Sequence, residues 1–163
     1  MQEAFGVIGR ASSLTEIQRL RLIGTLSHAA GGGGMVGGQV HDISGDMTDL
    51  DAVLHMQALK TGALIRASAE GAAICVGATS EQTSQAAQFG TALGLLFQLT
   101  DDLLDKEQDL EEGGNNVLHH IDESSVRTRI DEVAQSAYEA LSRFPGDSTI
   151  LRSFVKRIVH RDV

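Results

Sequence analysis

The chain has 163 residues, of which 42% are hydrophobic and 21% are charged, so it can bury the core of one domain and is too apolar to be disordered. Its formal net charge of −9 argues against a nucleic-acid partner, which would favour clustered Lys and Arg. The charge does not exclude an anionic ligand, because metal ions can neutralise phosphates locally. We therefore expect a single globular unit over residues 1–163.

The cysteine count and the start of the chain bear on its location. A single cysteine, Cys75, rules out a disulfide within the chain and favours the cytoplasm. Met1 leads into Gln and Glu rather than into a basic and then apolar stretch, so no signal peptide is expected. No apolar run is long enough to span a bilayer, which predicts no integral membrane segment.

The first third of the chain has a helical pattern. Residues 1–9 resemble the end of a helix with no capping signal before it, which favours a truncated chain; a short native N-terminal helix is the alternative. Ser13–Glu16 matches a capping box and predicts a helix over residues 14–30. Gly31–Gly34 interrupts this helix, and the helical pattern resumes over residues 35–42.

The middle of the chain predicts two more helices. From about residue 48, one helical face carries Leu50, Val53, Leu54 and Gln57. The pattern continues into the small-residue stretch 63–78, which suits a helix packed closely inside a bundle. Thr79–Gln82 is another capping-box candidate, and the most apolar helix of the chain follows over residues 81–106.

The last third predicts a loop and two further helices. Residues 107–116 are acidic and rich in Gly and Asn, which is typical of a loop. The next helix is amphipathic, with an apolar face formed by Val126, Ile130, Val133, Ala137 and Leu141. Phe144–Asp147 ends it, and a last helix carries Ile150, Leu151, Phe154 and Ile158. Because no strand alternation or hairpin turn is present, we expect an all-α bundle of about six helices.

The clearest chemical signal is the aspartate-rich segment Phe97–Asp105. Asp101 and Asp105 are four residues apart and share a helix face, while Asp102 is turned by about 100°, so three carboxylates are expected within one turn. The leucines around them predict burial, which is costly for carboxylates without a compensating cation. Mg²⁺ prefers such oxygen ligands and bridges them to phosphates. The alternative is a solvated acidic face near a helix end.

Two weaker signals precede this segment. Lys60–Gly62 places a lysine before a hydroxyl, a pair that can grip a phosphate, although a surface lysine is the commoner outcome. Gln39 and Asp42 share a helix face, beside glycines that permit close approach of a ligand or a tight helix crossing. The histidines match no Ser/His/Asp, HExxH or zinc pattern.

Three blocks together resemble, in order and spacing, the C-terminal motifs of the trans-isoprenyl diphosphate synthases, or polyprenyl synthetases, such as farnesyl and geranylgeranyl diphosphate synthases. The blocks are Gly34–Gln39 with Asp42, Lys60–Leu64 and Gly94–Asp105, and Ala4-Phe5 also resembles a helix of that family. The resemblance implies a helical bundle of the isoprenoid synthase type, of which this chain is the C-terminal half. The half that carries the first aspartate-rich motif and the basic residues for isopentenyl diphosphate is absent.

The resemblance also implies roles for single residues. The implied ligands of Mg²⁺, which would hold an allylic diphosphate, are Asp101, Asp102 and Asp105. The implied catalytic residues are Lys60, which would contact the same diphosphate, and Thr61 and Gln98, which would line the path of the reacting carbons. Gln39 and Asp42 would complete the wall of the substrate pocket.

The function implied for the complete protein is that of a Mg²⁺-dependent prenyltransferase in isoprenoid biosynthesis, a cytoplasmic homodimer that condenses an allylic diphosphate with isopentenyl diphosphate. The 163-residue chain alone is expected to be inactive. Residues 107–116 lack the lysines that the family carries there, which leaves open a non-catalytic or regulatory subunit that dimerises with an active synthase. A third alternative is a helical interaction module that binds no small molecule.

Overall fold

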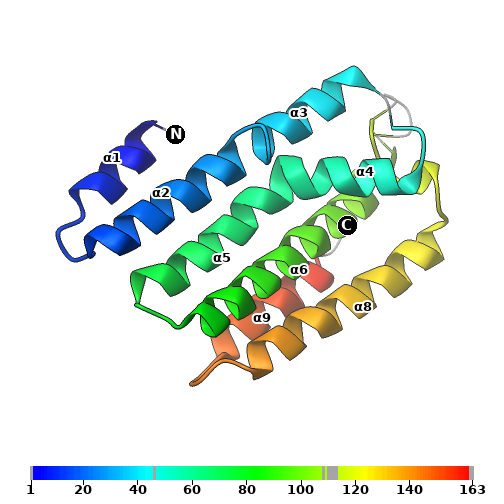
Figure 1. The fold of residues 1–163 in the computed structure, drawn as a ribbon. Coiled ribbons are helices and arrows are strands. Elements are labelled where there is room, and N and C mark those ends of the chain that lie inside the picture. The colour runs from blue at the N-terminus through cyan, green and yellow to red at the C-terminus, as the bar shows by residue number, and fades with distance from the viewer. Residues whose placement is uncertain (1, 46, 108, 110–113, 162–163) are drawn as a thin grey trace.

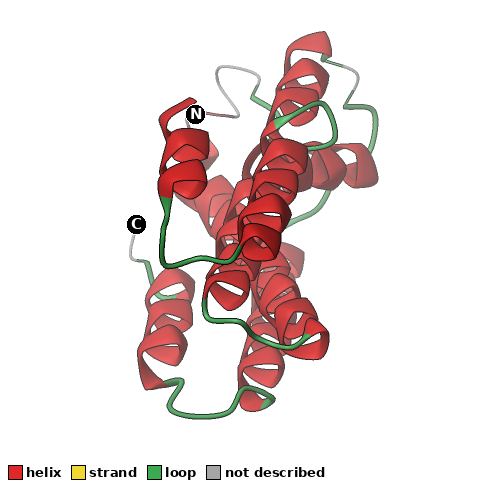
Figure 2. Ribbon diagram, turned by 60° about the vertical axis from the view of Figure 1, so that its left-hand side comes forward, coloured by secondary structure: helices red, strands yellow, loops and turns green. Residues whose placement is uncertain are grey.

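A computed structural model describes residues 2–45, 47–107, 109 and 114–161 of the protein. Figures 1 and 2 show that this part of the chain is a bundle of helices with short connections, and it contains no strand, as predicted. The α-helices are α1 (Gln2–Arg10), α2 (Glu16–Ala30), α3 (Met35–Ser44), α4 (Leu50–Gln57), α5 (Ala63–Cys75), α6 (Ser80–Leu104), α8 (Glu123–Ser142) and α9 (Thr149–Val159).

Helix α6 is the centre of the bundle and lies between α5 and α8 (Figure 1). Its side chains Leu96 and Leu99 are fully buried, at 0% exposure. They belong to one core with the predicted apolar face of α8, where Val126, Ile130 and Leu141 are buried. Burial of these apolar faces is the main favourable contribution to the stability of the bundle.

Two capping boxes were predicted, and the structure contains two, one of them at a different place. Thr79 caps α6 and pairs reciprocally with Gln82, as predicted. The predicted box at Ser13–Glu16 is wrong, because Thr15 is the N-cap of α2 and its reciprocal partner is Gln18. The Gln18 amide also donates to the carbonyl of Ile74, 2.9 Å away, so the observed register joins α2 to the end of α5.

A π-helical turn, η1 (Ala58–Gly62), joins α4 to α5 and contains Lys60 and Thr61. The sequence predicted an uninterrupted helix here. One π-turn adds a residue to the helical repeat and turns the following side chains relative to the preceding ones; such turns are frequent at functional sites. The lysine and the threonine therefore lie on a locally widened turn rather than on a regular α-helix.

Two glycines allow η1 to pack closely against its neighbours. A Cβ atom on Gly38 of α3 would lie 2.2 Å from the backbone nitrogen of Lys60. A Cβ atom on Gly94 of α6 would lie 2.9 Å from the Cα of Gly62. Both distances are too short for a side chain, so these glycines fix η1 between α3 and α6.

The chain beyond α6 differs from the predicted loop. The helix was predicted to run to Lys106 but ends at Leu104, and Asp105 is its C-cap. Lys106, Glu107 and Asp109 are nevertheless helical, and the Asp109 N–H donates to the Asp105 carbonyl at 2.8 Å. The other predicted loop residues 108 and 110–113 lie outside the described residues, and a 3-10 turn, η2 (Val117–His119), leads to α8.

The described part of the chain contains no candidate membrane-spanning helix. None of the helices there combines the length and the apolar character that a bilayer crossing requires.

Replacing Gly38 by Ala should destabilise the fold, because the added methyl group meets backbone atoms of Lys60 that cannot move aside. We expect the free energy of unfolding to fall by about 1–3 kcal/mol. Gly24 is the matched control: it is exposed within α2, and nothing lies within 4 Å of an added Cβ. Gly24→Ala should raise stability by about 0.5–1 kcal/mol. Equal effects of the two variants in urea unfolding would contradict the close crossing.

Candidate active site

The aspartate-rich segment occupies the C-terminal end of α6 and the residue after it. Asp101 is half-buried, Asp102 is buried and Asp105 is exposed. Asp101 and Asp105 share the outer face of this last turn, because they are four residues apart. Asp102 points into the bundle, so the predicted convergence of three carboxylates is not observed; two of the three face outward.

The Asp102 carboxylate is held by hydrogen bonds from two other segments. The Gln57 amide of α4 donates to both carboxylate oxygens, at 3.1 and 2.9 Å, and the Val117 N–H donates to one of them at 3.1 Å. Burial raises the pKa of Asp102 to about 6, although the hydrogen bonds from Gln57 and Val117 act to lower it. The hydrogen bonds therefore offset only part of the cost of burying this charge.

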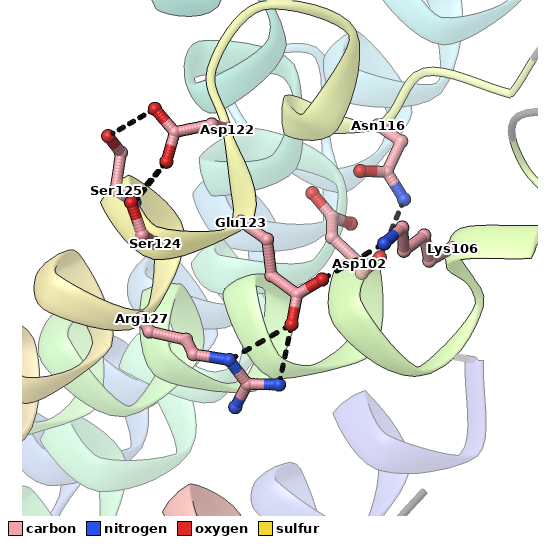
Figure 3. Close-up of polar contacts among 8 residues, drawn as sticks. All are labelled: Asp102, Lys106, Asn116, Asp122, Glu123, Ser124, Ser125 and Arg127. Atoms are coloured by element: carbon pink, nitrogen blue, oxygen red, sulfur yellow. Dashed lines mark hydrogen bonds and ion pairs between the residues drawn. The ribbon is translucent and has the colours of Figure 1, made fainter.

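The segment that returns from α6 to α8 is also anchored at Asp102. The side chain of Asn116 is fully buried and donates to the Asp102 carbonyl at 2.9 Å, as Figure 3 shows. Lys106, beside the motif, instead pairs with Glu123 at the start of α8 at 2.9 Å (Figure 3). The lysine next to the aspartates is thus directed toward α8.

A cation from the end of the chain lies nearer to the outward carboxylates. The Arg161 guanidinium lies 3.6 Å from Asp101 and 5.3 Å from the centre of the Phe97 ring. Burial and the charges of Asp105 and Asp109 raise the pKa of Asp101, while Arg161 acts to lower it. The raised pKa means that negative charge here is only partly compensated, which favours an additional cation.

Lys60 is paired with a carboxylate of α3. Its ammonium lies 2.7 Å from Oδ2 of Asp42, and the Asn115 amide donates to Oδ1 of Asp42 at 3.0 Å. Burial acts to raise the pKa of Asp42, but the hydrogen bonds from Lys60 and Asn115 and the lysine charge outweigh it, so the pKa lies below its ordinary value. The predicted substrate-binding residues Asp42 and Lys60 are therefore brought together.

The packing of α4 and η1 against α6 sets the turn that carries Lys60 and Thr61 along the part of α6 that carries Gln98. Gln57 contacts Asp102, and Gly62 contacts Gly94, so the two segments run in opposite directions. Lys60 and Thr61 lie between Gln57 and Gly62, and Gln98 lies between Gly94 and Asp102. The register therefore aligns the two stretches of backbone, while the Lys60 side chain reaches Asp42 on α3.

A cavity of about 640 Å³ opens next to this contact. Gln98 and Gln57 line it, and much of the remaining wall is apolar, including Leu54, Ala58, Leu59, Ala63 and Leu95. Its walls come from α2, α4, η1, α5 and α6. The lining also includes the polar or charged side chains His28, Arg66 and Glu70. A largely apolar cavity with a few polar groups suits a ligand with a hydrocarbon body.

The structure also places residues that were not predicted as site residues. Gln57 was assigned only to a helix face, and its polar side chain among apolar neighbours was the available signal. Asn115, Asn116 and Arg161 had no signal, because their roles depend on contacts across the fold. Gln39 was predicted for the pocket wall; it is half-buried on α3, and its role stays a prediction.

The donor set at the motif fits Mg²⁺. Among the described residues, no three His, Cys, Asp or Glu side chains are arranged to hold a metal ion, but Asp101 and Asp105 offer two carboxylates on one face. Mg²⁺ is commonly bound by one or two carboxylates, with phosphate and water completing its octahedral shell. The arrangement therefore suits an ion that arrives with a phosphorylated ligand.

The raised pKa of Asp102 predicts a specific pH dependence of stability. Its folded-state pKa of about 6 exceeds the ordinary value of 3.8, so protonation favours the folded state, and this contribution is lost as pH rises through about 6. Without divalent cations, the free energy of unfolding of the wild type relative to Asp102→Asn should rise by about 2–3 kcal/mol from pH 7 to pH 4. The raised pKa of Asp102 would be contradicted if urea unfolding showed the same difference in free energy between the wild type and Asp102→Asn at both pH values.

Comparison with known proteins identifies the family. The family model for polyprenyl synthetase matches residues 3–140. The chain is 35% identical to a geranylgeranyl diphosphate synthase of Pantoea ananas over 150 residues, which cover 87% of this chain and 50% of that protein. It is 31% identical to a farnesyl diphosphate synthase of Micrococcus luteus, over 99% of this chain and 60% of that protein.

Comparison with solved structures leads to the same family. The crystal structure of an FPP/GFPP synthase from Zymomonas mobilis superposes with a TM-score of 0.87 at 30% identity, covering 96% of this chain and 57% of that one. The predicted all-α fold of the isoprenoid synthase type is thus confirmed, and the chain spans about half the length of the curated relatives it matches. On the match of residues 3–140, the chain belongs to the polyprenyl synthetase family.

Proposed function

We propose that this chain is part of a prenyltransferase that condenses an allylic diphosphate with isopentenyl diphosphate in a Mg²⁺-dependent reaction. The observation that carries the proposal is the position of Gln98. It lines the apolar cavity, lies on the stretch of α6 that packs against η1, and is one turn before Asp101 on α6. The cavity would hold the hydrocarbon part of a ligand, and the aspartates on the next turn of α6 would bind the metal ion of its diphosphate.

Each group of residues would act on one part of the substrate. Asp101 and Asp105 would hold the metal on the outer face of the motif, and Asp102, whose carboxylate accepts hydrogen bonds from Gln57 and Val117, would contribute charge and hold the motif in place. The bound Mg²⁺ would neutralise the diphosphate and help it depart. Lys60 would bind the same diphosphate as a point charge.

The apolar cavity would hold the hydrocarbon chain away from water. The allylic C–O bond would break with its electron pair leaving on the diphosphate, and the double bond of isopentenyl diphosphate would then attack the allylic carbon. Loss of a proton to the departed diphosphate would restore a double bond. The side-chain oxygen atoms of Thr61 and Gln98 would face the reacting carbons. Their partial negative charges would stabilise the positive charge that develops there. Gln39 and Asp42 would complete the wall.

The relatives named above are diphosphate synthases of about twice this length, so we infer that the 163 residues alone lack part of the machinery and are inactive. We also infer that the complete protein is cytoplasmic, in keeping with the single cysteine among these 163 residues. If the protein is instead a non-catalytic subunit, mixing it with an active synthase should change the reaction rate of that synthase.

A homodimer is supported by exposed apolar side chains on α1, α2 and α3. Ile17 and Leu20 of α2 are 71% and 70% exposed. On α3, Val36, Val40 and Ile43 recur with helical spacing and are also exposed. Exposed apolar side chains of this kind mark a surface that packs against a partner subunit or against a part of the complete protein outside these 163 residues.

Replacing the outward carboxylates should weaken binding of a metal–diphosphate complex. In the protein expressed from the complete reading frame, Asp101→Asn and Asp105→Asn should each weaken Mg²⁺-dependent binding of dimethylallyl diphosphate by roughly 10–100-fold. Isothermal titration calorimetry with and without EDTA measures this. Glu132→Gln, which removes an exposed carboxylate of α8, is the control and should bind normally. No Mg²⁺-dependent binding by the unaltered protein would favour the interaction module instead.

In the protein expressed from the complete reading frame, Leu20→Glu should dissociate the proposed dimer, because a charged side chain in its interface would lose its hydration on association. Sedimentation velocity at micromolar concentration should show the wild type as a dimer and the variant as a monomer. Glu132→Lys, at an exposed position of α8, is a control for a change of surface charge. A variant that stays dimeric would place the interface elsewhere.

A further inference from the structure

The segment between α6 and α8 reaches the candidate site through two adjacent asparagines. Asn116 is fully buried, and its amide donates to the Asp102 carbonyl at 2.9 Å and to the Asp109 carboxylate at 2.8 Å. The side-chain oxygen Oδ1 of Asn116 accepts from the Leu118 N–H at 2.9 Å. With both donors and the acceptor satisfied, Asn116 fixes this segment on the end of α6.

Because Asn116 holds this segment in place, the neighbouring Asn115 can contact α3. Its amide donates to Oδ1 of Asp42 at 3.0 Å and to the Asp42 carbonyl at 3.2 Å. In Figure 1 the segment, in yellow, lies beside the end of α3 and the start of α4. The other carboxylate oxygen, Oδ2, accepts from the Lys60 ammonium at 2.7 Å. Asn115, Asp42 and Lys60 therefore form one hydrogen-bonded chain that joins three segments.

The amide is needed to orient this ion pair. The Lys60 and Asp42 side chains are 38% and 23% exposed, and an exposed lysine–carboxylate pair holds its geometry weakly, because the flexible lysine stem favours many conformers. Two hydrogen bonds from one amide to the Asp42 carboxylate and carbonyl limit rotation of that carboxylate. The oxygen that faces Lys60 is thereby fixed, and the ammonium is restricted with it.

We propose that Asn115 is a positioning residue that acts through Asp42 to hold the Lys60 ammonium where the diphosphate binds; this rests on the proposed function. The family carries lysines after the second aspartate-rich motif, and residues 107–116 contain none. At Asn115 and Asn116 the segment instead contacts the site through neutral amides. It thus orients an existing cation rather than adding one.

The first arm of the test measures Lys60 without any substrate. The chain has three lysines, Lys60, Lys106 and Lys156, so competitive acetylation followed by peptide mass spectrometry reports on each. In the protein from the complete reading frame, Asn115→Ala should raise labelling of Lys60 relative to Lys106 and Lys156 by about 3-fold or more, as expected when the hydrogen bonds that orient Asp42 are lost. Ser44→Ala, at the exposed end of α3, should leave the ratios unchanged. An unchanged Lys60 ratio in Asn115→Ala overturns the proposal.

The second arm is a double-mutant cycle on binding of Mg²⁺–pyrophosphate. Asn115→Ala should weaken binding by about 3–10-fold when Lys60 is present and should have no further effect in a Lys60→Met background. Equal weakening in both backgrounds would show that Asn115 does not act through Lys60 and would overturn the proposal. A melting temperature for each variant separates this from a general loss of stability, which would not depend on Lys60.

The two arms separate failure of the inference from failure of the proposed function. If Lys60 labelling responds to Asn115→Ala but the unaltered protein binds no Mg²⁺–pyrophosphate, the proposed function is wrong, and with it the link from Lys60 to a diphosphate. If the protein binds Mg²⁺–pyrophosphate but Lys60 labelling does not respond, the proposed function stands and the role of Asn115 is wrong.

Discussion

The arrangement of the candidate site depends on one buried carboxylate, Asp102. A charge in this position is costly unless it is hydrogen-bonded, and the fold supplies donors from Gln57 on α4 and from the backbone of Val117. These bonds tie α4 and the start of η2 to the same turn of α6. Because Gln57 is fixed there, the adjacent π-turn with Lys60 and Thr61 runs along the part of α6 that carries Gln98. A residue implied as a metal ligand thus also organises the positions of the predicted catalytic residues.

The motif therefore has an inner and an outer part with different chemistry. The inner part, Asp102 with Gln57 and Asn116, is buried and almost fully hydrogen-bonded, and its geometry is set by the fold. The outer part, Asp101 and Asp105, is open to solvent on one face, and the cation Arg161, which follows α9, lies beside Asp101. Repulsion between the outward carboxylates remains only partly compensated, which leaves a place for a metal ion that brings its own phosphate oxygens.

Patterns that are local in the chain predicted most of the fold. The apolar face of α8, the cap at Thr79 and the break at Gly31–Gly34 depend only on neighbouring residues. The cap of α2 was misplaced because Ser13 and Thr15 are both hydroxyl residues with a polar side chain three positions on, and the contact of Gln18 with Ile74, 56 residues away, distinguishes them. The π-turn has no local signature and is accompanied by close crossings at Gly38 and Gly94. The partners Gln57 and Asn115 could not be predicted, because they lie 45 and 73 residues from Asp102 and Asp42.

Formation of a carbon–carbon bond between the two diphosphates is the most direct test of the central claim, that this site belongs to a prenyltransferase. The protein expressed from the complete reading frame would be incubated with dimethylallyl diphosphate and labelled isopentenyl diphosphate, and the products separated by chromatography. The account predicts longer allylic diphosphates when Mg²⁺ is present and none when EDTA removes it. A folded protein that forms no such product with Mg²⁺ would contradict the account and favour a non-catalytic subunit.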